Sequence, residues 1–489
     1  MKGIAYWIEK RATITPGRIA VITEEEKITY KALHNKITDT AAFLKQSYGV
    51  ENGDRVAILS QNRLEYLVLI FALAKLGAIA VPLNIRLTSS ELCYQLKDSD
   101  TSVLIAEGLF YEQAQSLLQE TGIEHLAKIE AFAAIESAGN YPFREVNESA
   151  PFIICYTSGT TGKPKGAVLT QANMFWNAIN NVLAIDLTSA DRSIVLLPLF
   201  HIGGIGLFAL PTLFVGGTVI IPGKFEPQKA IAMIEQYEAT IVMGVPAIHK
   251  ALIECPSFKR EKMKAVRWFY NGGAPCPHEL IQTFFDHGFL FGQGFGMTET
   301  SPTLFMLSRE DAPRKIGSIG KPVMYSDFKL VNQEGDVGEL VVKGPNIMTE
   351  YWRKPAATNE TIIDGWLYTG DLARIDEEGF VYIVGRKKEM LISGGENIYP
   401  LEIEQAISQH TDVSEVAVTG VADPVWGEVP AAFVVKKPSS ELTDKDIIEY
   451  CRDKLAKYKL PKEIIFMDEL PKNATGKIQK NQLGKLIQE

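Results

Sequence analysis

Hydrophobic and polar positions in residues 30–107 alternate between helix-like and strand-like spacing. The first predicted helix has apolar side chains at every third or fourth position, at Leu33, Ile37, Ala41 and Leu44. Short apolar segments predict buried strands at residues 56–59, 78–83 and 102–106. Helices are expected between them, over residues 64–76 and 90–97. Strands that alternate with helices favour a mainly parallel sheet with helices on both faces.

A second sheet of the same kind is predicted further along the chain. Its strands are expected near residues 194–197, 218–221 and 240–244, with a helix over residues 228–237. Residues 108–148 carry a weaker pattern and are expected to link the two sheets. Within residues 316–385, short β-rich segments punctuated by glycine predict an antiparallel sheet or a small barrel.

The final part of the chain has a periodicity of its own. After the charged cluster at residues 385–389, one helix is expected to start at Pro400 and another at the capping pattern of Thr443 and Asp446. Strands at residues 413–418, 431–435 and 464–467 complete a small α+β module. We therefore expect an α/β protein with two domains. Residues 1–385 would hold two parallel-rich αβ sheets and a small barrel-like part, and residues 386–489 would form a small, mobile α+β domain.

Composition narrows the class of protein. The chain has 489 residues, enough for two or three domains, and its formal net charge of −9 argues against a nucleic-acid partner. The five cysteines are odd in number and include no Cys-x-x-Cys pair, which is typical of a reduced protein without a cysteine metal site. Two long apolar stretches, residues 66–83 and 194–222, are interrupted by Lys75 or by prolines, so we interpret them as buried core. No secretory signal is apparent, and we predict a cytoplasmic protein without stable membrane insertion.

The first candidate for chemistry is residues 157–166, which read Thr-Ser-Gly-Thr-Thr-Gly-Lys-Pro-Lys-Gly and follow an apolar strand. Glycines let several backbone N–H groups face one anion, while hydroxyls donate hydrogen bonds and lysines supply charge. The candidate phosphate ligands are Thr157, Ser158, Gly159, Thr160, Thr161, Gly162, Lys163 and Lys165. The spacing is not that of a P-loop, because only two residues separate Gly159 from the Gly-Lys pair. An ordinary surface turn is the alternative interpretation.

A second glycine-rich stretch, residues 292–300, ends in a hydroxyl and a carboxylate at Thr298 and Glu299. A magnesium ion bound to a polyphosphate needs such oxygen ligands. On the residues alone, the same pair fits a helix cap equally well.

Both stretches closely resemble motifs of the adenylate-forming superfamily, which contains the acyl-CoA synthetases, the adenylation domains of peptide synthetases and the luciferases. The resemblance implies that Thr298 contacts the α-phosphate of ATP and that Glu299 holds Mg²⁺. The neighbouring nucleotide contacts that it implies are Gly294, Phe295, Gly296 and Met297.

Further motifs follow in the order of that family. Asp371, in a Tyr-Thr-Gly-Asp string, and Arg386 are implied to contact the ribose. The adenine is implied to stack on Gly272, Gly273, Ala274 and Pro275. Asn271 departs from this pattern, because a small residue is expected there. Without the resemblance, an aspartate after glycine is most often an ordinary turn residue.

Three more features carry implied roles. His201 would form a gate between the carboxylate pocket and ATP, and Lys477 would bridge the acid and the nucleotide. The loop with Gly394, Gly395 and Glu396 would approach the adenylate in the thioester step. The small domain would rotate about Lys388 between these two steps. Taken alone, a single buried histidine is usually a core residue, and a lysine near the chain end is usually a solvated charge.

The resemblance implies an ATP-dependent acyl-CoA synthetase that makes acyl-CoA through acyl-AMP and releases AMP and pyrophosphate. ATP, Mg²⁺ and coenzyme A are the implied cofactors and co-substrates. The segments expected to line the acid pocket are apolar or small and contain no arginine for a second carboxylate, which favours a fatty or aromatic monocarboxylate. An o-succinylbenzoate–CoA ligase or another specialised acid–CoA ligase is the alternative. The sequence also leaves a homodimer open.

One further glycine motif fits an enzyme of another class. Residues 204–209 fit the dinucleotide pattern Gly-x-Gly-x-x-Gly/Ala, with Glu226 downstream, as in an NAD-dependent oxidoreductase. Pro211 interrupts the helix that this motif requires, which disfavours the interpretation. A binding module without catalysis is disfavoured because Glu299, Asp371 and Lys477 are all present.

Overall fold

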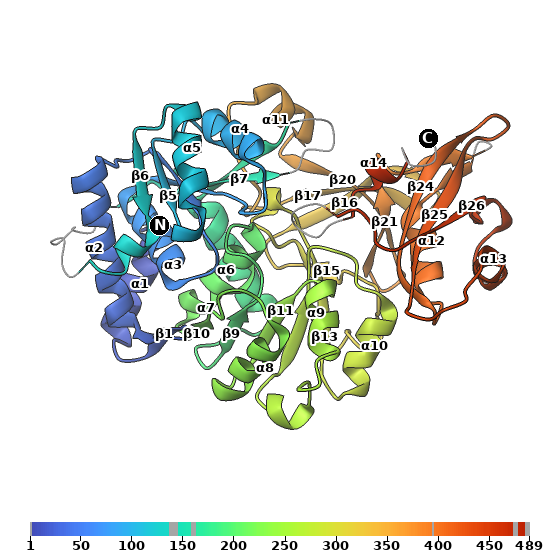
Figure 1. Cartoon of the computed structure of the whole chain (residues 1–489), viewed down its shortest axis with the longest axis horizontal. Helices are drawn as coiled ribbons and strands as arrows, with labels where there is room; N and C mark the ends of the chain where they lie inside the picture. The colour runs from blue at the N-terminus through green and yellow to red at the C-terminus, as the bar shows by residue number, and fades with distance from the viewer. Residues whose placement is uncertain (1, 136–144, 158–162, 394–395, 473–477, 485–489) are drawn as a thin grey trace.

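The computed structural model describes residues 2–135, 145–157, 163–393, 396–472 and 478–484. Two large sheets, a smaller antiparallel sheet and a C-terminal module make up the molecule, and the module lies at one end (Figure 1). The predicted α/β class, with a large N-terminal part and a smaller C-terminal part, is confirmed.

The first large sheet has seven strands. They are β3 (Arg55–Leu59), β4 (Ile79–Pro82), β5 (Val103–Ala106), β6 (His125–Lys128), β7 (Pro151–Thr157), β8 (Lys165–Thr170) and β18 (Glu350–Tyr351). Their order is β18-β8-β7-β4-β3-β5-β6. Pairing is parallel from β7 to β6, whereas β8 runs antiparallel to both β7 and β18.

The helices of this region are α1 (Ala5–Ile14), α2 (Tyr30–Tyr48), α3 (Leu64–Leu76), α4 (Ser89–Ser99) and α5 (Tyr111–Thr121). Every residue of α3 is buried, as its continuous apolar sequence predicts. The expectation that residues 108–148 merely link the two sheets is wrong. They include α5, which buries Ala114 and Leu117, and β6, which extends the first sheet beside β5. The pattern was weak because β6 is an edge strand that carries a histidine and a lysine.

The second large sheet has nine strands. They are β1 (Ile19–Ile22), β2 (Lys27–Thr29), β9 (Arg192–Val195), β10 (Thr218–Ile220), β11 (Ile241–Gly244), β12 (Trp268–Asn271), β13 (Phe291–Phe295), β14 (Phe305–Met306) and β15 (Lys321–Pro322). The order is β15-β14-β13-β12-β11-β9-β10-β1-β2, and the six strands from β13 to β1 are parallel. The carboxyl ends of these six strands therefore share one edge.

Helices cover both faces of the second sheet. One face packs against α8 (Pro227–Gln236), α9 (Pro246–Ile253) and α10 (His278–Asp286). The other face packs against the end of α6 (Gln171–Ala184) and the π-helix η3 (Gly204–Ala209), which continues into α7 (Leu210–Val215). The predicted strands and helix of this sheet are confirmed to within a few residues.

The antiparallel region predicted for residues 316–385 is also present. Its strands are β16 (Asp327–Glu334), β17 (Val337–Lys343), β19 (Ile362–Ile363), β20 (Trp366–Ile375) and β21 (Val381–Arg386), and α11 (Pro355–Thr361) precedes β19. All of these strands pair antiparallel.

The C-terminal module has its own apolar core. Its strands are β22 (Leu391–Ser393), β23 (Glu396–Ile398), β24 (Val413–Asp423), β25 (Gly427–Lys436) and β26 (Glu463–Met467). Its helices are α12 (Pro400–Ser408), α13 (Asp444–Arg452) and α14 (Lys480–Leu483). The predicted capping box of Thr443 and Asp446 starts α13. Across the described part of the chain, no helix has both the length and the hydrophobicity that crossing a membrane requires.

Candidate active site

The base of the predicted phosphate loop is a pair of antiparallel strands. Strand β7 ends at Thr157 and β8 begins at Lys165, and these two residues pair in register. Lys163 is exposed, with its ammonium 5.4 Å from the centre of the Tyr94 ring. The predicted ligands Ser158, Gly159, Thr160, Thr161 and Gly162 lie outside the described residues. Thr157 and the two lysines therefore flank the carboxyl end of β7, the edge where open α/β sheets bind ligands.

The candidate metal ligand Glu299 lies beside this base. It belongs to the short helix η5 (Thr298–Thr300) and is 5% exposed. Strand β18 pairs with β8 and brings in Tyr351, whose hydroxyl donates to Glu299 Oε1 at 2.8 Å. The Lys165 ammonium lies 5.0 Å from the centre of the same tyrosine ring. Burial and the nearby carboxylate raise the pKa of Tyr351 and keep it a neutral donor.

Tyr351 was not predicted from the sequence. It meets Glu299 only because β18 pairs with β8, and nothing in the local pattern around residue 351 announces that pairing. The structure thus brings Lys165 and Glu299 to one tyrosine.

The glycines before Glu299 are explained by close packing. A Cβ on Gly296 would collide with the carbonyl oxygen of Pro302, and one on Gly294 would lie 2.9 Å from the carbonyl oxygen of Phe305. Phe295, between the two glycines, and Met297, after them, are half-buried against the main core. The stretch therefore needs glycine for its own fold, whatever it binds.

His201 lies in the segment between β9 and η3. Its Nδ1 accepts a hydrogen bond from the Gly203 N–H at 3.2 Å, so the neutral ring carries its proton on Nε2. The residue is exposed overall, yet protein atoms around the ring partly desolvate it. This partial desolvation lowers the pKa of His201 below its usual value, and the ring is neutral at pH 7.

The predicted adenine segment follows β12. Gly272, Gly273, Ala274 and Pro275 leave the carboxyl end of that strand, next to the end of β13. Gly273 has a φ of +84°, which a side chain would strain. Asn271, which departs from the expected small residue, is 2% exposed, and its Nδ2 donates to the Ala274 carbonyl at 2.9 Å. The asparagine thus braces the turn that presents these four residues.

The predicted ribose ligands meet across two paired strands. Asp371 on β20 is opposite Arg386 on β21, and Arg386 Nε lies 2.8 Å from Asp371 Oδ1. Asp371 is 2% exposed, and its own N–H donates to Thr369 Oγ1 at 3.1 Å. The arginine fixes a carboxylate that can accept hydrogen bonds from a diol.

Of the predicted residues in the C-terminal module, the structure describes Glu396, which is exposed at the start of β23. Gly394, Gly395 and Lys477 lie outside the described residues. Close by in the chain, the Lys480 ammonium is 2.8 Å from Glu404 and 3.0 Å from Glu389. Burial disfavours its charge, but the two carboxylates outweigh burial and raise the pKa of Lys480. The sequence shows no sign of this half-buried cluster, because a lysine beside polar residues looks like a surface charge.

The structure contradicts the dinucleotide interpretation of residues 204–209. These residues form the π-helix η3 and not a turn between a strand and a helix. A Cβ on Gly206 would lie 2.7 Å from the carbonyl oxygen of Ser301, and one on Gly204 would collide with the carbonyl of Pro198. The glycines serve helix packing, so the resemblance to a nicotinamide site is accidental.

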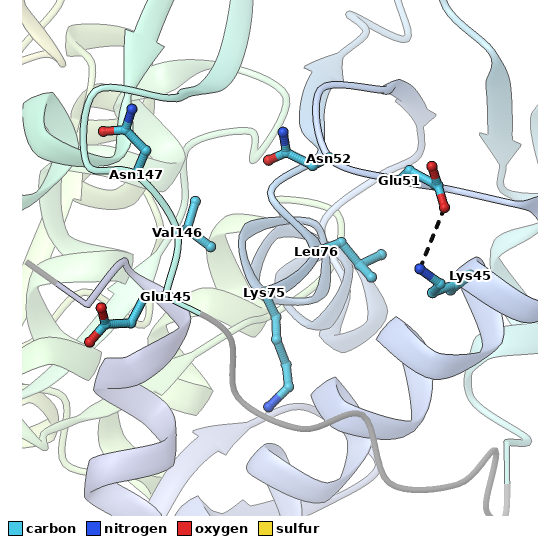
Figure 2. A pocket seen from close by; sticks show the side chains of 8 residues that line it. All are labelled: Lys45, Glu51, Asn52, Lys75, Leu76, Glu145, Val146 and Asn147. Atoms are coloured by element: carbon cyan, nitrogen blue, oxygen red, sulfur yellow. Dashed lines mark ion pairs between the residues drawn. The ribbon is translucent and has the colours of Figure 1, made fainter.

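A cavity of about 290 Å³ lies away from all these groups (Figure 2). It is lined by Lys45, Glu51, Asn52, Lys75, Leu76, Glu145, Val146 and Asn147. Asn52 precedes β3 and Leu76 precedes β4, so the cavity is at the amino ends of the strands, opposite the edge that holds Thr157. Burial lowers the pKa of Lys75, whose ammonium is 3.7 Å from Glu9.

Comparison with known proteins identifies the family of the chain. A family model described as AMP-binding enzyme matches residues 8–352, and one described as AMP-binding enzyme C-terminal domain matches residues 402–477. Feruloyl-CoA synthase from Amycolatopsis sp is 39% identical over 488 residues, covering 99% of this chain and 98% of the relative. Indoleacetate–CoA ligase from Aromatoleum aromaticum is 37% identical over 500 residues, with 99% and 98% covered.

A solved structure agrees with these matches. The o-succinylbenzoate CoA synthetase from Bacillus subtilis, in complex with the acyl-adenylate intermediate OSB-AMP, superposes with a TM-score of 0.88 at 34% identity. The alignment covers 98% of this chain and 97% of that one. The chain therefore belongs to the AMP-binding enzyme family, within the adenylate-forming superfamily that its motifs indicate.

Proposed function

We propose that this chain is an ATP-dependent acid–CoA ligase, which converts a carboxylic acid to acyl-CoA through acyl-AMP and releases AMP and pyrophosphate. The observation that carries this proposal is the meeting of Lys165, Tyr351 and Glu299 at the end of β7, in a chain that matches the family along nearly its whole length. A cation and a metal-binding carboxylate at one sheet edge suit a triphosphate.

In the first half-reaction, a carboxylate oxygen of the acid bonds to the α-phosphorus of ATP. The bond from that phosphorus to the bridging oxygen breaks, and pyrophosphate leaves with the electron pair. Lys163 and Lys165 would stabilise the charge on the departing phosphates, and Thr298 would hold the α-phosphate. Lys477 would orient the attacking carboxylate.

The donors around Glu299 fit a magnesium ion. No cluster of three or more possible metal ligands occurs among the described residues, and one buried carboxylate is what Mg²⁺ uses when phosphate oxygens and water fill its other positions. A bound ion would neutralise charge on the phosphates. Tyr351 holds one oxygen of Glu299 in place for that purpose.

In the second half-reaction, the CoA sulfur bonds to the acyl carbon and its proton passes to solvent. The bond between the acyl carbon and the phosphate oxygen breaks, and AMP leaves. Asp371 and Arg386 would hold the ribose throughout, and Gly272, Gly273, Ala274 and Pro275 would pack on the adenine. His201, neutral at pH 7, would separate the acid pocket from the nucleotide without adding charge.

We also propose that residues 1–385 and 386–489 are separate domains that turn about Lys388. The separate core of the C-terminal module supports this division. The turn would exchange Lys477 for the loop with Gly394, Gly395 and Glu396. The Lys480 cluster supports a common movement, because it ties the segment after Lys477 to Glu389, next to the proposed pivot.

The acid is proposed to be an aromatic monocarboxylate. Beyond His201, the space between the second sheet and η3 is filled by Phe208, Met243, Trp268 and Tyr270, all less than 5% exposed. The cavity left beside Gly203 and Gly204 is about 10 Å³, which is room for one water molecule. A long alkyl chain would need several of these side chains to move, whereas a flat ring needs fewer. The printed names of the relatives, feruloyl-CoA synthase and indoleacetate–CoA ligase, point the same way.

A panel of acids tests the proposal. Exchange of labelled pyrophosphate into ATP should depend on added acid, and aromatic monocarboxylates such as ferulate and indoleacetate should drive it better than palmitate or the dicarboxylate o-succinylbenzoate. Absence of exchange with every acid would overturn the ligase assignment. Preference for palmitate would overturn the aromatic assignment alone.

A cytoplasmic location is part of the proposal, supported by the five free cysteines. The homodimer that the sequence leaves open stays a prediction.

A further inference from the structure

The C-terminal end of α4 contacts both arms of the phosphate loop. On the first arm, the Tyr156 hydroxyl, one residue before Thr157, donates to Asp98 Oδ2 at 2.9 Å. On the second arm, the Tyr94 hydroxyl donates to the carbonyl oxygen of Pro164 at 3.2 Å and lies 3.4 Å from Asp98 Oδ1. Pro164 stands between the two lysines of the loop. The Asp98 carboxylate thus bonds directly to the strand that enters the loop, and the Tyr94 hydroxyl beside it bonds to the segment that leaves the loop.

The segment after Tyr351 closes the same cluster. The Lys354 ammonium is 2.7 Å from Asp98 Oδ1, and the Trp352 indole N–H donates to the Asp98 carbonyl at 3.1 Å. The Trp352 backbone N–H donates to the Gly166 carbonyl at 2.7 Å, just after Lys165. The Asp98 side chain is 10% exposed, so water competes little for these bonds.

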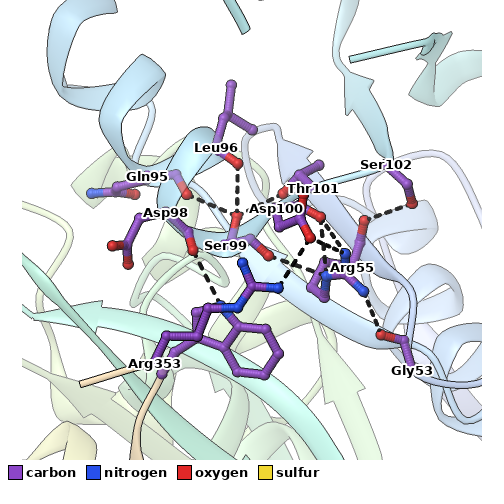
Figure 3. A network of polar contacts seen from close by, with 11 residues as sticks. Gly53, Arg55, Gln95, Leu96, Asp98, Ser99, Asp100, Thr101, Ser102 and Arg353 are labelled. Atoms are coloured by element: carbon purple, nitrogen blue, oxygen red, sulfur yellow. Dashed lines mark hydrogen bonds and ion pairs between the residues drawn. The ribbon is translucent and has the colours of Figure 1, made fainter. Parts of the chain in front are cut away.

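A neighbouring cluster provides a built-in comparison (Figure 3). Asp100, two residues further on, binds Arg55 and Arg353, each at 3.1 Å from its Oδ2. In Figure 3 the carboxylate of Asp98 points away from this group. The Asp100 carboxylate is 59% exposed and its ion pairs do not involve either arm of the loop. The two aspartates therefore share a helix end and differ in whether they hold the loop.

We propose that Asp98 is a positioning residue for ATP, which fixes the two arms so that Lys163 and Lys165 meet the triphosphate. This inference rests on the proposed function. The cations themselves are long and flexible, and an ammonium that must be ordered on binding loses affinity to conformational entropy. Anchoring the backbone on both sides of Lys163 reduces that loss before ATP arrives. Asp98 acts on the phosphates only, because the ribose and adenine groups stand on other strands.

The test compares two nucleotides and two matched variants. Asp98→Asn keeps the shape of the side chain but loses its charge and one acceptor, and Asp100→Asn makes the same change beside it. Binding of Mg·ATP and of AMP to each full-length protein is measured by calorimetry. We expect Asp98→Asn to weaken the binding of ATP about tenfold, which corresponds to the loss of one charge-assisted hydrogen bond. The affinity for AMP should stay unchanged. Asp100→Asn should leave both affinities unchanged.

A second variant guards against a folding defect. Tyr156→Phe removes one hydroxyl and should selectively weaken the binding of ATP. Combining it with Asp98→Asn should cause little further loss of affinity, because both changes break the same hydrogen bond. Equal weakening of ATP and AMP, additive losses, or the same effect from Asp100→Asn would overturn the positioning role. Failure of the wild-type protein to bind ATP would instead overturn the proposed function itself.

Discussion

The base of the phosphate loop and the joint of the C-terminal module are built in opposite ways. At the loop base, buried and half-buried groups from α4, β7, η5 and the segment of β18 hold one another beside one sheet, through Asp98 and Glu299. At the joint, the described side-chain contacts include three exposed ones. These are Lys250 Nζ to Ser414 Oγ at 3.3 Å, Lys437 to Glu279 at 3.7 Å, and an Asn397–Glu334 hydrogen bond.

This difference suits two kinds of task. Exposed ion pairs contribute at most about 1 kcal/mol each, so the module can leave one position for another at low cost. Buried, mutually bonded groups cannot separate without leaving charges unpaired, so the loop base stays in one arrangement. On the proposed function, the phosphate chemistry would take place in a fixed frame, and a movable part would carry Lys477. The following predictions test that assignment, from the largest expected effect to the smallest.

Removing the proposed catalytic lysine should separate the two half-reactions most strongly. In Lys477→Ala, adenylation should fall by at least about 100-fold, because a charge that stabilises the transition state is lost. Thioester formation from supplied acyl-AMP should stay near the wild-type rate. Lys472→Ala, which breaks an ion pair with Glu415 in the same segment, is the control. Equal loss of both half-reactions would remove this role.

A proline at the proposed pivot should also split the half-reactions. The Glu389 N–H donates to the Arg386 carbonyl at 2.9 Å, so Lys388 is the third residue of a turn, where proline is disfavoured. A proline that destabilises this turn by about 3 kcal/mol would slow a step that requires the turn by ~100-fold. We expect this loss of rate in one of the two half-reactions only, the one whose domain arrangement contains the turn. Stopped-flow assays of each step, with Lys388→Ala as control, provide the measurement. If both steps slow equally, the domains do not turn about this residue.

Neutralising the candidate metal ligand should affect adenylation less than the two changes above. Glu299→Gln is expected to raise the Mg²⁺ concentration for half-maximal adenylation at least about tenfold, since an amide is a weaker ligand for a hard cation. Direct titration with Mn²⁺ followed by electron paramagnetic resonance should show the same shift. Glu65→Gln is the matched control, because Glu65 is also buried but is paired with Arg63. An unchanged metal dependence would rule out the assignment.

The contacts at the joint should matter least. Replacing Lys250 and Lys437 together by alanine should change the free energy of unfolding by about 1 kcal/mol or less, because both contacts are exposed. Chemical denaturation measures this directly. A loss of several kcal/mol would mean that the module is fixed to the rest of the chain, and the contrast with the loop base would disappear.

The elements that could be predicted from the sequence are those whose signal is local. The continuous apolar segment of α3 and the capping box of α13 each lie within a few residues, and the structure places both elements as predicted. Asp371 and Arg386 each lie in a motif that resembles the family's, and the structure pairs them; that they bind the ribose stays a prediction.

What the sequence did not show depends on pairings between distant segments. Tyr351 reaches Glu299, and Asp98 reaches Tyr156, only after β18 has joined β8 and α4 has packed beside them. An aspartate at a helix end and a tyrosine in a two-residue strand look ordinary in isolation. Such supporting residues are visible only in three dimensions.

The central claim is that an acyl-adenylate forms in the fixed frame before CoA is used. A single-turnover experiment tests it most directly: excess protein is mixed with Mg·ATP and an aromatic acid in the absence of CoA. We predict that pyrophosphate is released in an amount equal to the protein-bound acyl-AMP formed, and that adding CoA then converts this acyl-AMP to thioester and free AMP. Release of pyrophosphate only after CoA is added, or formation of ADP and phosphate, would contradict the account.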